Sequence, residues 1–357
     1  IKGLTTNSKA VKKGFIFFAI KGHNSNGENY IKEAIKKGAS VIVCAKNCKF
    51  KNDKTIIIKT KKIRNYLSEI ASKFYNLKPK NIIAVTGTNG KTSVADFFYQ
   101  ILNLNRIPAA SIGTLGVKYK NKLIKTHLTS PDTITLHKFL EKIKKNGVDN
   151  VIIEASSHGL DQNRLDHLNL KGGIFTNLSQ DHLDYHKTMK AYLKAKLILF
   201  SKLLSKKNYI ISDQLNKEYI TLEKISKKRN LKLLNISKVI NHIKNIHLNF
   251  KGSFQIKNLS MAIMAAHLCG LNYSKIINSL KNIKSINGRL ELIKKYKNDI
   301  QVFIDYAHTP EALSEVLKSL KRYNKKITLI FGCGGERDFT KRSLMAKIAK
   351  HYCNKIY

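Results

Sequence analysis

The segment from Ile82 to Ser93 carries the side chains with the clearest chemical potential. It reads IIAVTGTNGKTS, which is an apolar strand, a turn containing two glycines, and a Lys-Thr pair that opens a helical pattern. Such a turn directs backbone N–H groups and the positive end of a helix dipole at phosphate oxygens. Lys91 would reach the β- and γ-phosphates of a nucleotide, and the Thr92 hydroxyl would bind Mg²⁺. Although Val85 stands where the first glycine of this motif is usual, the context predicts a phosphate-binding loop.

A second polar segment follows the apolar run Val151–Glu154 and reads EASSHGLDQNR. A carboxylate at the carboxyl end of a strand near a phosphate-binding loop is well placed to hold Mg²⁺. The loop that follows would then offer hydrogen-bond donors to an anionic substrate, from Ser156, His158, Gln162 and Arg164. An ordinary polar loop is the alternative interpretation of these residues.

A third segment, FTNLSQDHLDYH, places two carboxylates and two imidazoles within six residues. Asp181 and His182 could coordinate a metal, or one of them could act as a base. For Asp184 and His186 a polar helix cap is the simpler interpretation. Lys196 follows in a lysine-rich helical pattern, and composition alone predicts that it is a solvated charge.

Three further polar segments lie toward the end of the chain: Asn287-Gly-Arg289, Asp305-Tyr-Ala-His308, and the glycine cluster that begins at Gly332. The glycines permit close approach of the backbone to a ligand. Arg337, beside them, could bind a carboxylate through two parallel hydrogen bonds.

Strands and helices must bring these segments together. Short apolar runs alternate with helical patterns along the chain, which predicts an α/β fold with a parallel sheet and crossover helices. Polar stretches near Pro79 and Asn287 mark boundaries, so we expect units at 1–78, 79–287 and 288–357. In the last unit, Val302–Asp305, a helix at Pro310–Lys321 and Ile327–Phe331 should begin a βαβ unit. The first residue is not Met, and the chain ends inside an apparent strand, so we expect a fragment of a longer protein.

Composition narrows the functional class. The chain has 357 residues, 66 Lys+Arg and 23 Asp+Glu, which gives a net charge of +43. A nucleic-acid-binding ATPase is one interpretation of this charge, but lysines spread over every segment favour compositional drift. Five scattered cysteines, without a signal peptide or a long apolar run, predict reduced thiols, no zinc site, no membrane insertion and a cytoplasmic location.

Taken together and in order, the motifs GTNGKT, EASSHGL, FTNLS-DHLDYH, NGR-E, DYAHTP and GCGGERD resemble the Mur ligases, which add amino acids in peptidoglycan synthesis. The resemblance covers essentially the whole chain. It implies three domains: an N-terminal domain that holds a uridine nucleotide, a central P-loop ATPase domain, and a Rossmann-like C-terminal domain that is truncated here.

The resemblance also implies roles for particular residues. The ATP-binding set is Gly87, Thr88, Asn89, Gly90, Lys91, Thr92, Ser93, Asn258, Arg289 and Asp305. The UDP-binding set is Ser8, His23, Asn24 and Ser25; the muramoyl-peptide set is Thr129, Ser130, Ser156, Gln162 and Arg164; Arg337 would bind the incoming amino acid. The Mg²⁺ set is Thr92, Glu154, His182 and Lys196, the last as a carbamate formed with CO₂. Lys91, Lys196, His182 and Glu154 are the implied catalytic residues.

The implied reaction is an ATP-dependent amide ligation through an acyl phosphate. The motif forms most resemble the branch that adds meso-2,6-diaminopimelate to UDP-N-acetylmuramoyl-L-alanyl-D-glutamate. A branch that adds L-lysine is the alternative, and a nucleic-acid-binding P-loop ATPase is the alternative from another class. We expect a monomer that contributes to cell-wall synthesis, cell shape and division.

Overall fold

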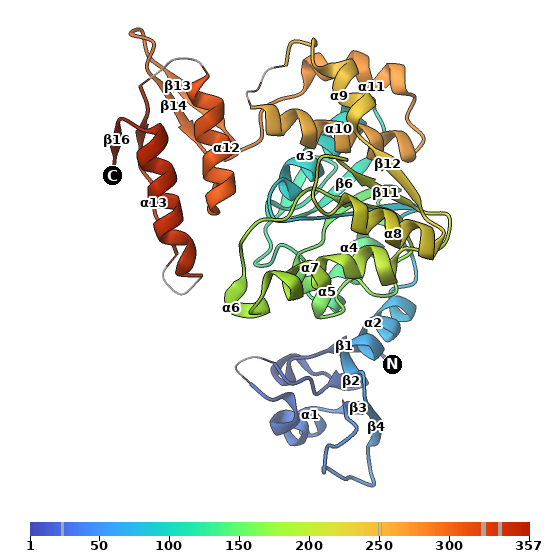
Figure 1. Ribbon diagram of the computed structural model, residues 1–357. Helices are drawn as coiled ribbons and strands as arrows, with labels where there is room; N and C mark the ends of the chain where they lie inside the picture. The colour runs from blue at the N-terminus through green and yellow to red at the C-terminus, as the bar shows by residue number, and fades with distance from the viewer. Residues whose placement is uncertain (23–24, 249, 251, 323–325, 335–337) are drawn as a thin grey trace.

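The computed structural model describes residues 1–357 except 23–24, 249, 251, 323–325 and 335–337. Its described strands form a four-stranded sheet, an eight-stranded sheet and two two-stranded sheets. Figure 1 shows the first sheet at one end of the molecule, the eight-stranded sheet in the middle, and the last elements beside the middle part.

The N-terminal sheet is parallel, in the order β1-β2-β3-β4. Its strands bury apolar side chains on both faces, as crossover connections require. The elements of this part are β1 (Gly3–Thr5), η1 (Ser8–Ala10), β2 (Phe15–Phe18), η2 (Gly27–Tyr30), α1 (Ile31–Lys36), β3 (Ala39–Ala45), β4 (Ile56–Thr60) and α2 (Ile63–Phe74).

The central sheet has the order β12-β11-β10-β5-β9-β6-β7-β8. Five of its neighbouring pairs are parallel, which confirms the expected parallel sheet, and β7 adds an antiparallel edge by pairing with both β6 and β8. Its strands are β5 (Asn81–Thr86), β6 (Ala109–Gly113), β7 (Gly116–Tyr119), β8 (Lys122–Ile124), β9 (Asn150–Glu154), β10 (Leu170–Phe175), β11 (Tyr209–Ser212) and β12 (Lys232–Asn235).

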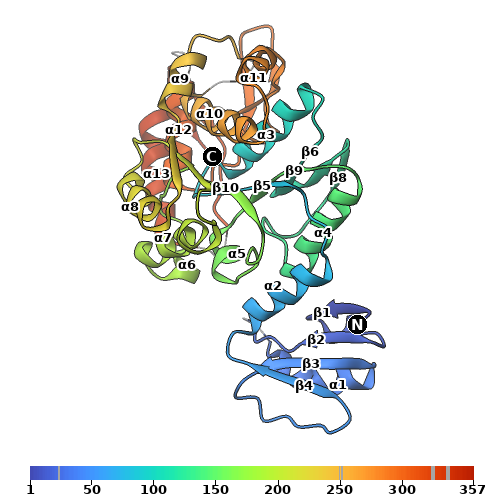
Figure 2. The ribbon, with the colours of Figure 1, turned by 90° about the vertical axis from the view of Figure 1, so that its right-hand side faces the viewer.

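Helices cover both faces of this sheet (Figures 1 and 2). Because strand side chains alternate between faces, Ile83 and Val85 of β5 belong to one apolar core while Ile82 and Ala84 belong to the other. One face carries α3 (Lys91–Leu104), α9 (Ser237–Ile243), α10 (Ser253–Leu268), α11 (Tyr273–Ser279) and η4 (Leu280–Asn282). The other carries α4 (Thr133–Lys145), α5 (Ser157–Asp161), α7 (Met189–Ile198), the π-helix η3 (Leu199–Leu203) and α8 (Tyr219–Arg229), while the short α6 (Leu183–His186) contacts α7.

The last part begins with an antiparallel hairpin rather than with the predicted βαβ unit. β14 pairs with β13, and β15 pairs with β16, so the two strands expected to be neighbours belong to different sheets. The elements are β13 (Glu291–Lys295), β14 (Gln301–Ile304), α12 (Pro310–Lys321), β15 (Thr328–Leu329), α13 (Thr340–Tyr352) and β16 (Lys355–Ile356). α12 and α13 pack together over a small apolar core.

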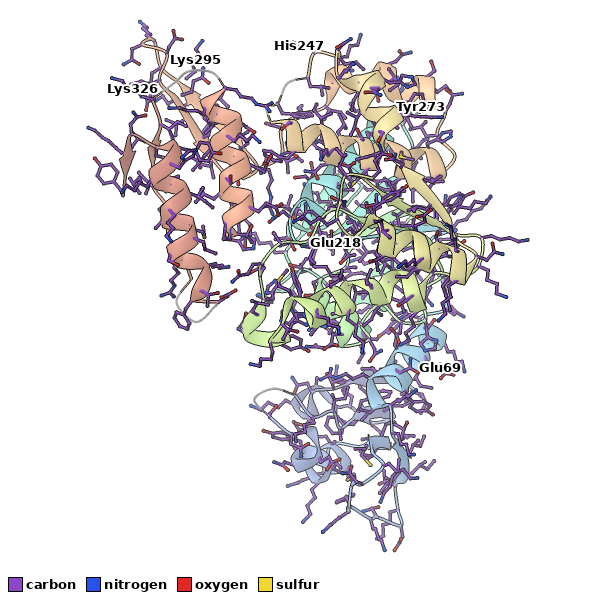
Figure 3. The ribbon with its side chains drawn as sticks, in the orientation of Figure 1. Glu69, Glu218, His247, Tyr273, Lys295 and Lys326 are labelled. Atoms are coloured by element: carbon purple, nitrogen blue, oxygen red, sulfur yellow. The ribbon has the colours of Figure 1, made fainter. Side chains whose placement is uncertain are left out.

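Exposed lysines occur on all three parts, for example Lys37, Lys206 and Lys326. Figure 3 shows Lys295 and Lys326 on the outer side of the last part. None of the helices in the described ranges is long and apolar enough to cross a membrane.

Candidate active site

The phosphate-binding loop connects the carboxyl end of β5 to α3, at the middle of the central sheet. Gly87 and Gly90 have φ of +146° and +88°, a region that residues with a Cβ rarely occupy. A Cβ on Gly87 would also collide with the Thr176 hydroxyl, and one on Gly90 with the Asn258 amide oxygen. The two glycines are therefore required both by the backbone conformation and by their close neighbours.

Two lysine ammonium groups converge on this loop. Lys91 Nζ donates to the carbonyl oxygens of Gly87 and Thr88 at 2.9 and 2.8 Å, and Lys196 Nζ donates to Gly87 O at 2.7 Å. Burial lowers the pKa of both amines, and the nearby positive charge of Lys91 lowers that of Lys196 further. Lys196 is only 1% exposed and also lies 4.2 Å from the centre of the Tyr192 ring. The composition-based prediction of a solvated Lys196 was therefore wrong.

The Glu154 carboxylate ends β9 beside the loop and is almost fully buried. Its Oε2 accepts a hydrogen bond from Thr92 Oγ1 at 3.0 Å, and Oε1 accepts one from the Thr114 backbone N–H at 2.9 Å. Thr114 Oγ1 donates to Oε2 at 3.1 Å. Arg289, from the start of the last part, donates to Thr92 Oγ1 at 3.2 Å. Hard oxygen donors are thus gathered where the nucleotide phosphates would lie, which is the donor chemistry that Mg²⁺ prefers.

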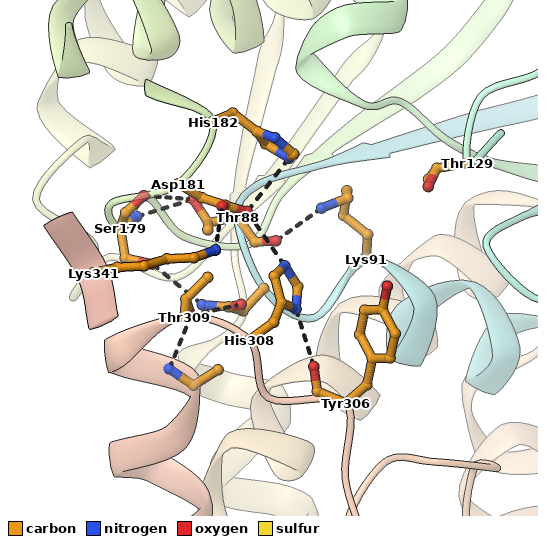
Figure 4. A network of polar contacts seen from close by, with 12 residues as sticks. Thr88, Lys91, Thr129, Ser179, Asp181, His182, Tyr306, His308, Thr309 and Lys341 are labelled. Atoms are coloured by element: carbon orange, nitrogen blue, oxygen red, sulfur yellow. Dashed lines mark hydrogen bonds and ion pairs between the residues drawn. The ribbon is translucent and has the colours of Figure 1, made fainter. Parts of the chain in front are cut away.

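Asp181 connects the central part to the last part (Figure 4). Its Oδ1 lies 3.1 Å from Lys341 Nζ of α13, and its Oδ2 lies 3.3 Å from Nε2 of His308 and 3.4 Å from Nε2 of His182. Burial acts to raise the pKa of this carboxyl, but the His308 hydrogen bond and the charges of His182, His308 and Lys341 outweigh it and hold the pKa well below its usual range. Asp181 is therefore ionised, and its contacts with His308 and Lys341 link the central part to the last part.

His182 is the N-cap residue of α6 and has a φ of +55°. Burial lowers the pKa of its imidazole to about 4, against the opposing charge of Asp181. The ring is therefore neutral at neutral pH and retains a nitrogen lone pair that a metal could accept. Within the described ranges, no group of three or more His, Cys, Asp and Glu side chains is arranged to hold a metal, so a cation here would depend on hydroxyl and phosphate oxygens as well.

These groups surround a cavity of about 410 Å³. Most of the residues predicted for ATP and metal binding line it: Thr88, Asn89, Gly90, Lys91, Thr92, Ser93, Glu154, His182, Lys196, Asn258, Arg289 and Asp305. Gly87 contributes the carbonyl that holds the two lysines. Thr129 and Ser156 of the predicted peptide-binding set line the same cavity.

Asp305 and Arg289 approach the cavity from the loops that flank the hairpin. Asp305 accepts hydrogen bonds from the backbone N–H groups of Leu290 and Ala307 at 2.6 and 2.7 Å, and burial raises the pKa of its carboxyl. The Arg289 guanidinium stacks 4.6 Å from the centre of the Tyr306 ring. The backbone contacts fix the Asp305 side chain and the turn that presents Arg289.

Ser130, Gln162 and Arg164 lie behind the cavity wall rather than in its lining. Arg164 donates to Ser130 O and to Gln162 Oε1, both at 2.7 Å, and Ser130 Oγ donates to Glu154 O at 2.7 Å. In this conformation the three residues therefore support the Glu154 backbone.

A second cavity, of about 770 Å³, lies between the N-terminal part and the central part. Five basic residues line it: Lys21, Lys61, Lys62, Arg64 and Lys202. Neither Ser8 nor Ser25 is among its lining residues; Ser8 is buried and contacts Glu33, whereas Ser25 is exposed beside the cavity residue Asn26. His23, Asn24 and Arg337 lie outside the described residues.

Sequence reasoning missed several cavity residues. Thr114 and Thr176 lie in the lining, and Lys341 binds Asp181, yet none of the three was given a role. Thr176 belongs to the FTNLS motif and Lys341 follows the GCGGERD motif, whereas Thr114 stands outside every motif. His308 belongs to the DYAHTP motif, which was the one signal available for it. The remaining signal was positional, because Thr114 and Thr176 follow strands of the central sheet at the same edge as Glu154.

Comparison with known proteins finds relatives over nearly the whole chain. Residues 1–75 match the family model described as Mur ligase family, catalytic domain; residues 85–266 match Mur ligase middle domain; residues 288–357 match Mur ligase, glutamate ligase domain. A UDP-N-acetylmuramoyl-L-alanyl-D-glutamate–2,6-diaminopimelate ligase from Rickettsia montanensis is 39% identical over 378 residues, covering 98% of this chain and 78% of that protein. One from Rhizobium meliloti is 35% identical over 373 residues, covering 98% and 76%.

The structural comparison gives the same result. A solved structure of a UDP-N-acetylmuramoyl-L-alanyl-D-glutamate–2,6-diaminopimelate ligase superposes with a TM-score of 0.75 at 27% identity, covering 99% of this chain and 77% of that one. Fold and site together define an ATP-dependent ligase of the amide-forming class. The chain belongs to the Mur ligase family, which confirms the resemblance noted in the sequence.

Proposed function

We propose that this protein joins meso-2,6-diaminopimelate to UDP-N-acetylmuramoyl-L-alanyl-D-glutamate in peptidoglycan synthesis, at the expense of ATP. The named relatives support this substrate, since those described above carry that activity in their names at 35% identity or more over nearly the whole chain. The observation that carries the proposal is the cavity in which the phosphate-binding loop, Glu154 and Arg289 face one another.

The carboxylate of the substrate must first be activated, because oxide is a poor leaving group. The γ-phosphoryl group of ATP is transferred to the side-chain carboxylate of D-glutamate, and the amine then displaces phosphate to form the amide. Lys91 and Arg289 supply positive charge to the transferring group, and the loop amides orient the phosphates. Asn258 and Asp305 flank the nucleotide.

Mg²⁺ would be held by Thr92, Glu154 and His182, and when bound it stabilises the negative charge that develops on the phosphoryl oxygens. The paired oxygens of Thr92 and Glu154 and the neutral imidazole of His182 fit such a cation. The lowered pKa of both Asp181 and His182 makes either one a weak base, so we assign them to positioning and to metal binding.

Lys196 fits the proposed carbamate. Carbamate formation needs an uncharged amine, which attacks CO₂ and releases one proton. Burial lowers the pKa of Lys196, and among the described residues it forms no ion pair with a carboxylate. The carbamate would supply an anionic oxygen inside the cavity.

The carbamate has a test with its own readout. Lys196→Ala should lower turnover at least about a hundredfold, with partial recovery in acetate or formate, and a ¹³C carbamate signal from labelled bicarbonate should be lost. Lys194→Ala, in the same helix but exposed, is the matched control. Full activity in Lys196→Ala would eliminate the assignment.

We place the uridine diphosphate end of the substrate in the second cavity, near Ser25, where five basic side chains suit a diphosphate. The muramoyl peptide would then run toward Thr129 and Ser156 of the first cavity, which the backing residues Ser130, Gln162 and Arg164 support. We also propose the domain division 1–78, 79–287 and 288–357.

The decisive experiment measures phosphate release with ATP, Mg²⁺ and UDP-N-acetylmuramoyl-L-Ala-D-Glu, using meso-diaminopimelate and L-lysine in parallel. Release that requires diaminopimelate supports the proposal. Release that requires lysine keeps the mechanism and changes the amine. Stimulation by DNA or RNA, with neither amine active, would refute it.

A further inference from the structure

Asp166 collects three hydrogen bonds on a single carboxylate oxygen. Its Oδ2 accepts from Asn65 Nδ2 at 2.8 Å, from Asn163 Nδ2 at 3.0 Å and from Lys202 Nζ at 2.6 Å. The donors come from α2, from the loop after α5 and from η3, which are separate elements of the fold. Asp166 itself is only 1% exposed.

The three donors share a second property: all of them line the 770 Å³ cavity, whereas Asp166 does not. Asp166 therefore lies behind the wall and holds three of its side chains in fixed positions. Its other oxygen, Oδ1, is buried and has no hydrogen-bond partner among the described residues. A buried carboxylate with an unsatisfied oxygen is costly, so a role beyond packing would account for its presence behind this polar wall.

Docking of the N-terminal part has anchors besides the hydrogen bond from Asn65 to this carboxylate. Ser68 Oγ donates to the backbone oxygen of Asp166 at 2.6 Å, and Ser72 Oγ donates to that of His167 at 3.1 Å. Both bonds anchor α2 on the central part through backbone groups that any residue at position 166 would keep. The carboxylate can therefore be altered while these anchors remain.

The loop that carries Asp166 also contains Arg164, which lies behind the wall of the first cavity. Within the same few residues, Arg164 binds Ser130, and Ser130 binds the backbone of Glu154. Two hydrogen bonds therefore connect this loop to the backbone of Glu154.

We propose that Asp166 is a positioning residue, which fixes Asn65, Asn163 and Lys202 as the wall of the nucleotide subsite. The inference rests on the proposed function, because it assigns the second cavity to the uridine diphosphate. Lys202 keeps about half of its side chain exposed to the cavity while its ammonium is held by Asp166, so one N–H group is fixed and the others are available to phosphate oxygens.

The test measures the ligase reaction of the full-length protein and compares the effect of each variant on KM with its effect on kcat. Asp166→Asn keeps the shape of the side chain but removes its charge, and we expect the KM for the UDP-linked substrate to rise about tenfold. We expect kcat and the KM for ATP to stay within about twofold, a split that general destabilisation would not give. Lys202→Met should show the same change, since it removes the cation that Asp166 positions.

Two matched controls accompany these variants. Ser72→Ala removes a docking bond without touching the carboxylate, and Lys206→Met removes an exposed lysine next to η3 that does not line the cavity. Both should leave the KM for the UDP-linked substrate unchanged. A rise in the Ser72→Ala variant equal to that in Asp166→Asn would overturn the inference, because docking alone would explain it.

Titration with uridine diphosphate alone distinguishes the two proposals. Weaker binding by Asp166→Asn than by the unaltered protein supports the inference. Equal binding by both overturns the role of Asp166 and leaves the nucleotide site in place. No binding by the unaltered protein overturns the nucleotide site itself, and the inference with it.

Discussion

Replacement of Lys341 by Met tests the ion pair that joins α13 to the central part. The Asp181 and Lys341 side chains are only 4% and 5% exposed, so the ammonium and the carboxylate are both shielded from water. Removal of one partner of a buried pair typically costs 3–5 kcal/mol because the other charge is left uncompensated. Asp181 retains its His308 contact, so we expect Lys341→Met to lower the free energy of the first unfolding transition by about 2 kcal/mol, near the cost of one charge-assisted hydrogen bond.

A double-mutant cycle isolates this pair. Asp181→Asn alone should cost about 3 kcal/mol, because Lys341 then stays buried without an anion. The double variant should cost less than the sum of the single variants, with a coupling energy of about 1–2 kcal/mol. The chain contains no Trp, so urea unfolding is best followed by circular dichroism. Additive costs in the cycle would refute the contact.

The pH dependence of this pair has a defined sign. The folded-state pKa of Asp181 is lowered from its ordinary value of 3.8, so the contribution of the carboxylate is complete above that value and is lost as the pH falls below it. The difference between the unaltered protein and Lys341→Met should therefore be constant from about pH 5 to pH 8 and shrink below about pH 4. A difference that disappears above pH 5 would contradict the assignment.

Three further predictions follow from local environments. The unfolded His182 imidazole takes up its proton near pH 6.5 and the folded one only near pH 4, so the free energy of unfolding should fall as pH is lowered through this window, and His182→Gln should flatten the slope. In thermal melts, Gly87→Ala should cost several kcal/mol of stability, and it should also abolish nucleotide binding, because the new Cβ would collide with Thr176. Gly147→Ala is the control: its φ is also positive, at +75°, but no atom lies within 4 Å of the new Cβ, so it should cost only about 1 kcal/mol. Burial and a hydrogen bond with Cys48 raise the pKa of the Cys44 thiol to about 12. Iodoacetamide should therefore modify Cys44 at neutral pH only when the protein is unfolded, and mass spectrometry of the labelled peptide would show this.

Much of the fold was predictable because its signals are local. The bounds expected for the helix Pro310–Lys321 are those observed, since Thr309 caps its first turn and Pro310 suits the first helical position. The hairpin of β7 and β8 was missed for a local reason as well. Its turn residues, Lys120 and Asn121, both have positive φ, as a tight hairpin requires, but they lack the glycine that usually announces such a turn.

The site was predictable only where a motif surrounds the residue. Lys91 and Glu154 follow strands in recognisable contexts, and the cavity contains both. Lys196 differs from other lysines only in the surroundings that the fold gives it, so composition could not identify it. The contact between Asp181 and Lys341 joins residues 160 positions apart, and a single sequence carries no signal for such a pairing.

The convergence of Lys91 and Lys196 on the Gly87 carbonyl has a chemical consequence. The two side chains share one neutral acceptor, and the positive charge of Lys91 disfavours a second positive charge on Lys196. Under the proposed carbamate, Lys196 would instead carry a negative charge beside the Lys91 ammonium, which is a favourable pairing. If the carbamate forms, dissolved CO₂ sets the charge beside the phosphate-binding loop, and protein prepared in degassed buffer would differ electrostatically from protein of the same sequence kept in bicarbonate.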